Sequence, residues 1–401
     1  MKLTLLLDLD DTLLQNSMDK FLPGYFKALS QHLFKTVPQD QLVQHLMHAT
    51  KMMSSNNRPD ITLKEIFDKS FYPALGYSEE LLHDQVEDFY DNVFPQLQDL
   101  AQPMPGAQNL IHETLNRGYD LIIATNPLFP LRAILHRISW AGLSEQINAF
   151  QMIPSYETMH YAKPNPAYFA ELLARTGWQD QPAMMVGNDL QLDIHPAQKS
   201  GILTYWVTKE NNQDNQAGGE LDQLISWIDQ NDLEKNQIDF STPEAILAVL
   251  KSTPAALPFL CAQLNSTDWN TRFQTNEWSQ AEILCHFRDV EIEVNLPRIK
   301  KSIEEENPFI AGIETDQWAE QRQYIKQSGQ SALKSFIQAR IELISKLENL
   351  PKDDWVHQIR HAIFGPTTIL ELVGFMAAHD RIHIQQIYKN QSYSTDIKKA
   401  S

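Results

Sequence analysis

The chain has 401 residues, of which 42% are hydrophobic and 21% charged, and its formal net charge is −18 at pH 7. This length exceeds what one hydrophobic core usually covers, so it predicts two domains. The acidic balance argues against nucleic acid or an anionic membrane surface as a partner, and with no expected signal peptide or membrane-spanning run the sequence predicts a cytoplasmic location.

The amino terminus begins with an apolar run, residues 3–7, that predicts a strand buried on both faces. Two carboxylates, Asp8 and Asp10, follow directly after it. Open α/β sheets bind their ligands at the carboxyl ends of such strands, so we expect this acidic pair to lie in a binding site. An alternative is that Asp10 or Asp11 only caps the next turn.

Residues 16–99 then show helical spacing of apolar side chains, for example between Phe26 and Leu33. This stretch is too long for a loop. It predicts an all-α cap inserted after the first strand, a position from which it could exclude water and select the substrate. Met18, Met52 and Met53 could line that cap, or they could fill its core.

Three later segments add polar groups beside apolar runs or at a helix start. These groups are Thr125 and Asn126 after residues 121–124, Lys163 before a proline-initiated helix, and Asn188, Asp189 and Asp193 after residues 184–186. Each also has a plain structural interpretation: Thr125-Asn126-Pro127 is a turn signal, and Lys163 could be an ordinary solvated charge.

The ordered set Asp-x-Asp-x-Thr, Thr, Lys and Gly-Asn-Asp-x-x-x-Asp resembles the haloacid dehalogenase superfamily over roughly residues 1–232. The resemblance implies a Mg²⁺-dependent phosphatase or phosphotransferase on a Rossmann-like parallel sheet. Asp8 would be the nucleophile that forms an aspartyl-phosphate. Asp10 would protonate the leaving oxygen and then activate water. An acid at position 10 favours phosphate over halide as the group removed.

The same chemistry suggests how the other residues act. Thr125, Asn126 and Lys163 would bind the phosphate, and Lys163 would also neutralise charge at the nucleophile. Asp8, Asp10 through its backbone carbonyl, Asp189 and Asp193 would form an oxygen-only Mg²⁺ site. Members of the family usually carry an aspartate directly after the glycine. This chain has Asn188 there, and we favour Asp189 as the ligand because it is charged.

The composition of residues 209–240 is mostly polar. It predicts a loop, a short helix from Leu221 to Ile228 and a linker. We expect a first domain at 1–235, a linker at 236–242, a second domain at 243–390 and a tail at 391–401. From residue 242 on, the pattern predicts helices and no strands. The four helices expected, roughly 243–264, 279–305, 330–349 and 368–388, suggest an all-α four-helix bundle.

Histidines carry the chemistry of this bundle. His379 and His383, spaced i,i+4, would face the same side, and His286 lies on the second helix. Three imidazoles in a bundle core would make an open metal site. Spacing alone is weak, because 13 histidines make chance pairs common and His357/His361 is a second pair, in an expected loop.

The segments Glu277-Trp278-Ser279-x-x-Glu282-x-x-x-His286 and Ala378-His379-Asp380-x-x-His383 resemble the DinB-like four-helix family, over about residues 243–390. The resemblance implies that His286, His379 and His383 bind a transition metal, either Zn²⁺, Ni²⁺ or Fe²⁺. Some members are thiol S-transferases. The alternative is a set of histidines without metal in the bundle core.

The preferred hypothesis is a phosphatase that hydrolyses a small phosphorylated metabolite, with the bundle as an auxiliary domain. A second hypothesis makes the bundle the working part, as a metal-dependent thiol S-transferase or metal-binding module. A third makes it a dimerisation module that gives a homodimer. A phosphomutase, which would use the same Asp8 and Asp10, also stays open.

Overall fold

The computed structural model describes residues 2–33, 37–209, 216–233, 238–262, 264 and 268–400. The chain forms two compact units. The first comprises Met1–Asn57, Ile61–Leu172 and Asp180–Ile238, and the second comprises Arg58–Asp60, Leu173–Gln179 and Asp239–Ser401. The boundary expected near Lys235 lies outside the described residues, as do residues 236 and 237 of the expected linker.

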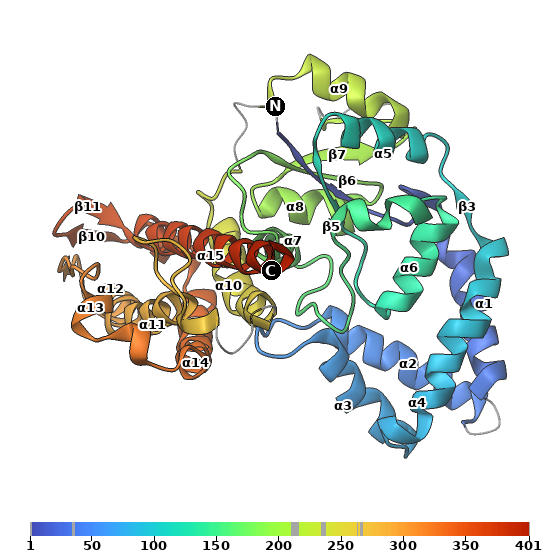
Figure 1. Ribbon diagram of the computed structural model, residues 1–401, viewed down its shortest axis with the longest axis horizontal. Coiled ribbons are helices and arrows are strands. Elements are labelled where there is room, and N and C mark those ends of the chain that lie inside the picture. Colours follow the sequence, from blue (N-terminus) through green and yellow to red (C-terminus); the bar gives the residue numbers. More distant parts are fainter. Residues whose placement is uncertain are drawn as a thin grey trace. The chain divides into compact units, whose positions relative to one another are not determined.

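A six-stranded sheet forms the centre of the first unit, with the strand order β5-β4-β1-β6-β7-β8 and every neighbouring pair parallel (Figure 1). The strands are β1 (Thr4–Leu7), β4 (Asp120–Ile123), β5 (Phe150–Met152), β6 (Ala183–Gly187), β7 (Leu203–Val207) and β8 (Gly218–Gly219). Every residue of β1 and β6 is buried. Central strands of a parallel sheet are covered on both faces, which explains their continuous apolar runs. The predicted Rossmann-like sheet is confirmed.

The register of the central strands places their carboxyl ends together. Leu7 of β1 lies opposite Ile123 of β4 on one side and Val186 of β6 on the other. The residues that follow these three positions therefore leave the sheet at the same edge. Connecting helices of this unit are α5 (Ala107–Asn116), α6 (Leu131–Trp140), α7 (Pro166–Arg175), α8 (His195–Lys199) and α9 (Leu224–Gln230).

A helical insertion follows β1, as expected. Two short strands, β2 (Leu14–Gln15) and β3 (Gln102–Pro103), pair in antiparallel fashion where the chain leaves and re-enters. Between them lie α1 (Met18–Leu33), α2 (Gln39–Ser54), α3 (Leu63–Leu75) and α4 (Glu79–Asp88), then a π turn (Phe89–Val93) and a 3₁₀ segment (Phe94–Leu100). We call α1–α4 the cap helices (Figure 1).

The three methionines of the cap have different surroundings. Met18 lines the large cavity described below, whereas Met53 is buried in the cap core. Met52 is 45% exposed. The cap core itself is aromatic: the ring of Phe94 stacks on Trp140 and meets Phe21 edge-on, at centroid distances of 5.3 and 6.0 Å. Such pairs hold the cap helices on the body of this unit.

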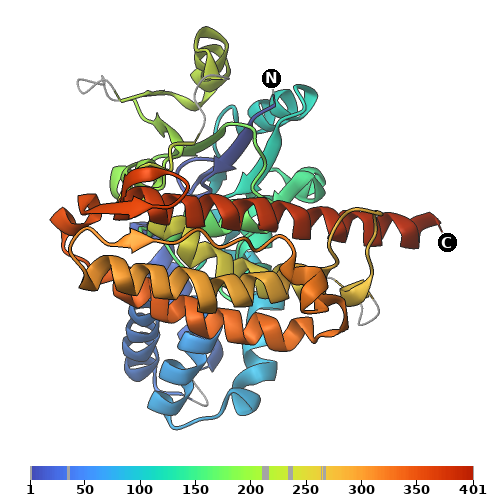
Figure 2. The ribbon, with the colours of Figure 1, turned by 90° about the vertical axis from the view of Figure 1, so that its left-hand side faces the viewer.

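Helices dominate the second unit (Figure 2). They are α10 (Pro243–Ala262), α11 (Gln280–Val290), α12 (Leu296–Glu304), the short α13 (Trp318–Gln321), α14 (Gly329–Glu348) and α15 (Ile369–Ala400). Ser279 caps α11 in a capping box with Glu282, and Thr368 and Glu371 exchange the same pair of bonds before α15. The predicted four-helix bundle is confirmed, and both capping boxes are present.

One expectation for this unit, that it contains no strands, was wrong. A small sheet occurs, of β9 (Phe309–Ile310), β10 (Gln358–His361) and β11 (Gly365–Thr368), because β10 alternates exposed and buried residues over only four positions, too few to register as a pattern. His361 therefore lies on a strand. Residues 391–400, where we expected a tail, continue the helix α15. The helix expected at 279–305 is present as a continuous helical run, Gln280–Glu304, with a π turn at Glu291–Asn295 just before Pro297, which has no N–H to donate.

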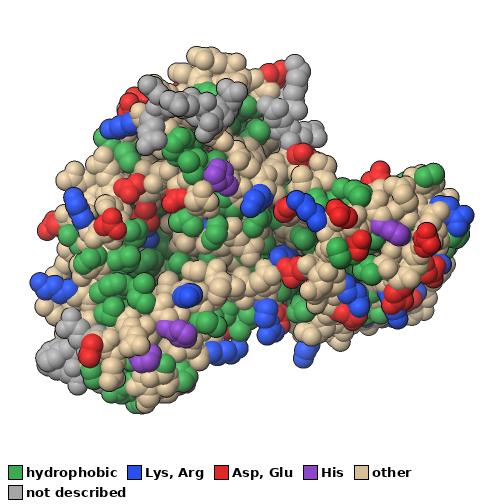
Figure 3. Space-filling view, turned by 180° about the vertical axis from the view of Figure 1, so that it is seen from behind, with side chains coloured by type: hydrophobic (Ala, Val, Ile, Leu, Met, Phe, Trp, Pro, Cys, Tyr) green, Lys and Arg blue, Asp and Glu red, His purple; other side chains and the backbone are tan. Residues whose placement is uncertain are grey.

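One further expectation concerned membrane spans. By length and composition alone, α10 is apolar enough to cross a membrane, contrary to what we expected. However, 78% of its most apolar window is buried inside the structure. This burial is typical of a core helix. On the face drawn in Figure 3, acidic and basic side chains of the described residues are interspersed.

Candidate active site

The loop after β1 carries the first two acidic residues. The backbone N–H groups of Leu13 and Leu14 both donate to the carbonyl of Leu9, and Asp11 adopts a positive φ of 54°. The chain thus turns tightly after Asp8 and does not continue as an extended strand. Both carboxylates nevertheless line one cavity.

Lys163 joins two carboxylates from different strand ends. Its Nζ donates to Oδ1 of Asp8 at 2.8 Å and to Oδ1 of Asp193 at 2.5 Å, and the side chain is 2% exposed. Burial lowers the pKa of the Lys163 ammonium, but the charges of Asp193 and Asp8 outweigh it and raise the pKa above its ordinary value. The interpretation of Lys163 as a solvated charge is therefore wrong.

Asp193 is a buried carboxylate that lies close to both Lys163 and Asp8. Burial raises its pKa to about 6, the charge of Asp8 adds to that rise, and Lys163 opposes it. Its Oδ2 accepts a hydrogen bond from the backbone N–H of Asp189 at 3.0 Å. A Cβ at position 187 would lie 2.3 Å from this oxygen, so Gly187 is needed for the close approach. One lysine thus faces two buried carboxylates.

Asn188 and Asp189 point their side chains to different partners. Thr12 Oγ1 lies 3.2 Å from Oδ2 of Asp8 and 3.3 Å from Oδ1 of Asn188, so the Asn188 amide faces the nucleophile position. Asp189 instead accepts hydrogen bonds from the backbone N–H groups of Gln191 and Leu192, at 2.7 and 2.9 Å. Its carboxylate caps the turn that follows β6.

The two polar groups after β4 also differ. Asn126 lines the cavity, and its Oδ1 is buried with no hydrogen-bond partner among the described residues. A buried amide oxygen without a partner is costly, so a ligand group or water is expected there. Thr125 is 1% exposed and is not among the residues that line the cavity. Its carbonyl accepts a hydrogen bond from Tyr168 at 2.6 Å.

Asp10 has a partner that we did not predict. The guanidinium of Arg137, from α6, forms an ion pair with its Oδ2, and Asn16 donates to its Oδ1 at 2.8 Å. Burial lowers the pKa of Arg137 to about 10, while the charge of Asp8 opposes that shift. One feature of the sequence could have indicated this ion pair. Arg137 lies on the apolar face of α6, between Ile134 and Ile138, and a charged side chain on such a face needs a buried partner.

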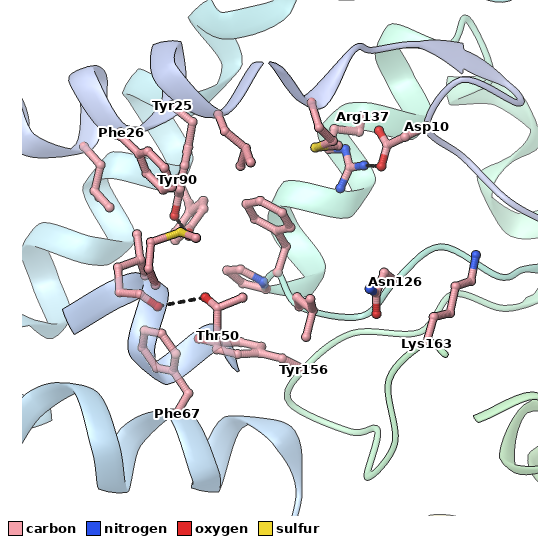
Figure 4. Close-up of a pocket in the computed structure, with 18 of the residues that line it drawn as sticks. Asp10, Tyr25, Phe26, Thr50, Phe67, Tyr90, Asn126, Arg137, Tyr156 and Lys163 are labelled. Carbon is pink, nitrogen blue, oxygen red and sulfur yellow. Dashed lines mark hydrogen bonds and ion pairs between the residues drawn. The ribbon is translucent and has the colours of Figure 1, made fainter. Parts of the chain in front are cut away.

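These residues border one cavity of about 480 Å³, within the usual range for ligand sites. Asp8, Asp10, Asn126, Lys163, Asn188, Asp189 and Asp193 all line it. In Figure 4, Asp10, Arg137, Asn126 and Lys163 lie on one side, and Tyr25, Phe26 and Phe67 of the cap helices, with Tyr90 of the π turn that follows them, lie on the other. The structure thus brings all the predicted residues of the first unit except Thr125 to one cavity.

The second unit brings its three predicted histidines together. Nε2 of His379 lies 2.9 Å from Nε2 of His286 and 3.1 Å from Nε2 of His383. Their ligand atoms lie within 4.8 Å of one another. Nδ1 of His383 lies 2.7 Å from Oε1 of Gln386, an acceptor that holds the ring proton on Nδ1 and leaves the lone pair on Nε2.

Burial keeps these imidazoles neutral. It lowers the pKa of His286 to about 3 and the pKa values of His379 and His383 below their ordinary value, and the proximity of the rings adds to the shifts of His286 and His379. Neutral imidazole is the form that binds a metal ion. The Nε2 atoms of the three neutral imidazoles face one another, and this arrangement matches the donor set of an open three-histidine metal site.

A buried ion cluster lies beside the histidines in sequence. Arg340 of α14 donates from Nε to Glu291 at 2.5 Å and pairs with Asp380 through its other nitrogens, and the three side chains are at most 1% exposed. The backbone carbonyl of Leu250 accepts a further bond from Arg340 at 3.3 Å. We did not predict this cluster. It ties three helical segments together next to His379.

Comparisons with known families agree with both units. Residues 5–207 match the family described as haloacid dehalogenase-like hydrolase, and residues 250–387 match the DinB superfamily. Both resemblances inferred from the motifs are therefore confirmed.

Two curated relatives and one solved structure give the range of similarity. A phosphoserine phosphatase of Thermus thermophilus is 26% identical over 51% of this chain and 88% of its own length. The pyrimidine 5′-nucleotidase PynA of Streptococcus pneumoniae is 27% identical over 34% of this chain, and the match spans only 58% of PynA. YfiT of Bacillus subtilis, a four-helix bundle of unusual topology, is 19% identical over 38% of this chain and 87% of its own, with a TM-score of 0.35.

Proposed function

Because the chain belongs to the haloacid dehalogenase-like hydrolase family, we propose that its first unit hydrolyses a phosphate monoester with Asp8 as the nucleophile. The observation that carries this proposal is the convergence of three side chains on the wall of one cavity: Asp8 and Asp193, which follow the neighbouring strands β1 and β6, and Lys163 from the loop before α7. Catalysis of phosphoryl transfer depends mainly on positioned charges that stabilise the transition state, and this cluster supplies such charges.

In the first step, a carboxylate oxygen of Asp8 attacks phosphorus and the ester oxygen leaves. Lys163 and Thr12, which both contact Asp8, hold the carboxylate in one orientation. The Asn126 amide, whose oxygen lacks a partner among the described residues, can bind the substrate next to Asp8. The bond from phosphorus to the ester oxygen breaks as the new bond to Asp8 forms, and Asp10 gives its proton to the departing oxygen.

In the second step, Asp10 takes a proton from water, and the resulting hydroxide attacks the phosphorus of the aspartyl-phosphate. Phosphate leaves and the Asp8 carboxylate is restored. The Arg137 ion pair and the Asn16 hydrogen bond hold the Asp10 carboxyl group in one orientation for this step.

The residues present fit Mg²⁺. Asp8 and Asp193 are buried carboxylates that share one lysine, so two acidic groups face a single positive charge. Asp8, Asp193 and the carbonyl of Asp10 are hard oxygen donors of the kind Mg²⁺ prefers. Because Asn188 faces Asp8 while Asp189 caps a turn, we now propose Asn188 as the further ligand. When bound, Mg²⁺ would neutralise phosphoryl charge.

The test is phosphate release from a panel of phosphate monoesters in the presence of Mg²⁺. We expect Asp8→Asn to lower turnover by at least about 10⁴-fold, because the amide is nearly isosteric but cannot form the acyl-phosphate. Asp19→Asn, the same change on an exposed part of α1, is the matched control. Equal rates for wild type and Asp8→Asn would refute the proposal. Product that retains phosphate at a new position would indicate a phosphomutase.

The histidine cluster supports a second function, in the second unit. We propose that His286, His379 and His383 bind one divalent transition metal, Zn²⁺, Ni²⁺ or Fe²⁺, through their Nε2 atoms. Thiol S-transfer is the activity that the DinB-like resemblance offers. Homodimer formation through the bundle and the cytoplasmic location remain predictions.

Metal analysis of the purified full chain tests the second proposal. We expect about one transition metal ion per chain, lost in His379→Ala and retained in His357→Ala, since His357 lies outside the cluster. Equal metal content in both variants would rule out the histidine site.

A further inference from the structure

The wall of the active-site cavity has two chemically different parts. Its charged side chains, such as Asp8, Lys163 and Asp193, all come from the strand-end loops and α6. The cap helices contribute only uncharged side chains among the described residues, including Met18, Leu22, Phe26, Leu46, Phe67 and Phe71. We call this part the cap wall. A ligand that reaches from Asp8 toward the cap helices passes from a charged environment to an apolar one.

Three residues of the cap wall carry hydroxyl groups, Tyr25, Thr50 and Tyr72, and the hydroxyls of the first two are bonded within the protein. The Tyr25 and Tyr90 hydroxyls lie 3.0 Å apart and form a hydrogen bond with each other. Thr50 donates to the carbonyl of Leu46, one turn earlier in the same helix, at 2.8 Å. Such satisfied hydroxyls present mainly aromatic edges and methyl groups to the cavity. The cap wall therefore offers little to a polyhydroxylated or charged substrate.

The cations of the cavity are also occupied. Lys163 is shared by Asp8 and Asp193, and Arg137 is paired with Asp10. A substrate with a second anionic group, such as a carboxylate or another phosphate, would need its own partner once it is desolvated. The described residues that line the cavity include no further Lys or Arg. This charge pattern disfavours a second negative group away from the reacting phosphate.

The space beside the cap wall is large. The cavity of about 480 Å³ far exceeds the voids of a close-packed interior, which rarely hold more than a water molecule. Leu22 and Phe26 of α1 line it and are only partly buried by the protein itself. Apolar side chains around a preformed cavity are characteristic of a ligand site that recognises apolar groups.

We propose that the substrate is a phosphate monoester of a long apolar alcohol, with its phosphate at Asp8 and its hydrocarbon chain along the cap wall. This inference rests on the proposed function and narrows it to a substrate class. The ester is cleaved as described above: water supplies the oxygen of the phosphate released, and the apolar alcohol leaves with a proton from Asp10. The cap helices then select substrates by burial of apolar surface.

The test is a series of alkyl phosphates, from ethyl to octyl phosphate, assayed with Mg²⁺ below their micellar concentrations. We expect kcat/KM to rise roughly fourfold for each added methylene until the cavity is filled, the factor that corresponds to ~0.8 kcal/mol per buried CH₂. Leu22→Asn, which keeps the number and branching of the side-chain heavy atoms but replaces two methyl groups with an amide, should flatten this slope. Leu81→Asn, at a position on α4 that is 69% exposed and outside the cavity wall, should leave the slope unchanged.

The outcomes separate this inference from the function on which it rests. If phosphoserine or phosphoglycolate is hydrolysed with a higher kcat/KM than octyl phosphate, or if the alkyl series shows no slope, the apolar substrate class is wrong while the phosphatase function stands. If wild type and Asp8→Asn release phosphate from every ester at the same rate, the phosphatase function itself fails.

Discussion

Each unit of this protein buries one cation between two carboxylates, yet the two clusters differ in how completely they are closed. Arg340 bonds to Glu291, Asp380 and a backbone carbonyl, and all three side chains are sealed in the bundle. Lys163 bonds to Asp8 and Asp193, but both carboxylates border a cavity of about 480 Å³.

The difference shows that a buried cation between two carboxylates can have either a structural or a catalytic role. Arg340 has a rigid fork of donors that can satisfy two carboxylates at once, so its cluster is saturated and structural. Lys163 is a compact point charge, which leaves oxygens of Asp8 and Asp193 for a metal ion or a reacting phosphate. Openness to a cavity, more than burial, distinguishes the site that can perform chemistry.

The largest effect on folding is expected from Arg340→Met. Removing the guanidinium leaves two buried carboxylates without a counter-charge, and we expect the free energy of unfolding to fall by roughly 3–5 kcal/mol. Urea unfolding of the full chain measures this. The triple variant that also replaces Glu291 and Asp380 with leucine should recover most of the loss, because no unpaired charge remains. A single variant as stable as wild type would contradict a structural role.

Lys163→Met should show the reverse pattern. We expect kcat/KM for phosphate release to fall about 10³-fold, because one positioned cation is lost from the transition state. Stability should fall less than in Arg340→Met, since solvent in the cavity can hydrate the freed carboxylates. Kinetics and urea unfolding on the same preparation check both parts. A stability loss equal to that of Arg340→Met would remove the distinction between the two clusters.

The smallest expected effects concern the two residues after Gly187. Asn188→Ala should raise the Mg²⁺ concentration required for half-maximal activity by about tenfold, because a ligand oxygen next to Asp8 is lost. Asp189→Ala should leave that concentration unchanged and lower stability by about 1 kcal/mol, the usual value of a helix cap. Mg²⁺ titrations of activity would decide the assignment. The opposite result would restore Asp189 as the ligand.

Much of the fold follows from local patterns in the sequence. The continuous apolar runs at 3–7, 121–124 and 184–186 predict buried parallel strands, and the capping boxes at Ser279 and Thr368 mark where two helices begin. The short strand β10 escaped this reasoning because four residues are too few to establish a period. Residues 391–400 look polar, but they continue α15, which shows that polarity alone does not end a helix.

For the candidate sites too, some features follow from local sequence patterns and others depend on the tertiary structure. By itself, the sequence determined which residues stand at strand ends and which histidines share a helix face, because both depend on spacing along one element. Only the tertiary structure decided that Arg137 holds Asp10, that Asn188 and not Asp189 faces Asp8, and that an apolar wall lies opposite the charged groups. These facts depend on which side chains of distant segments meet, and side-chain direction across a packed interface is set by burial and pairing, not by spacing.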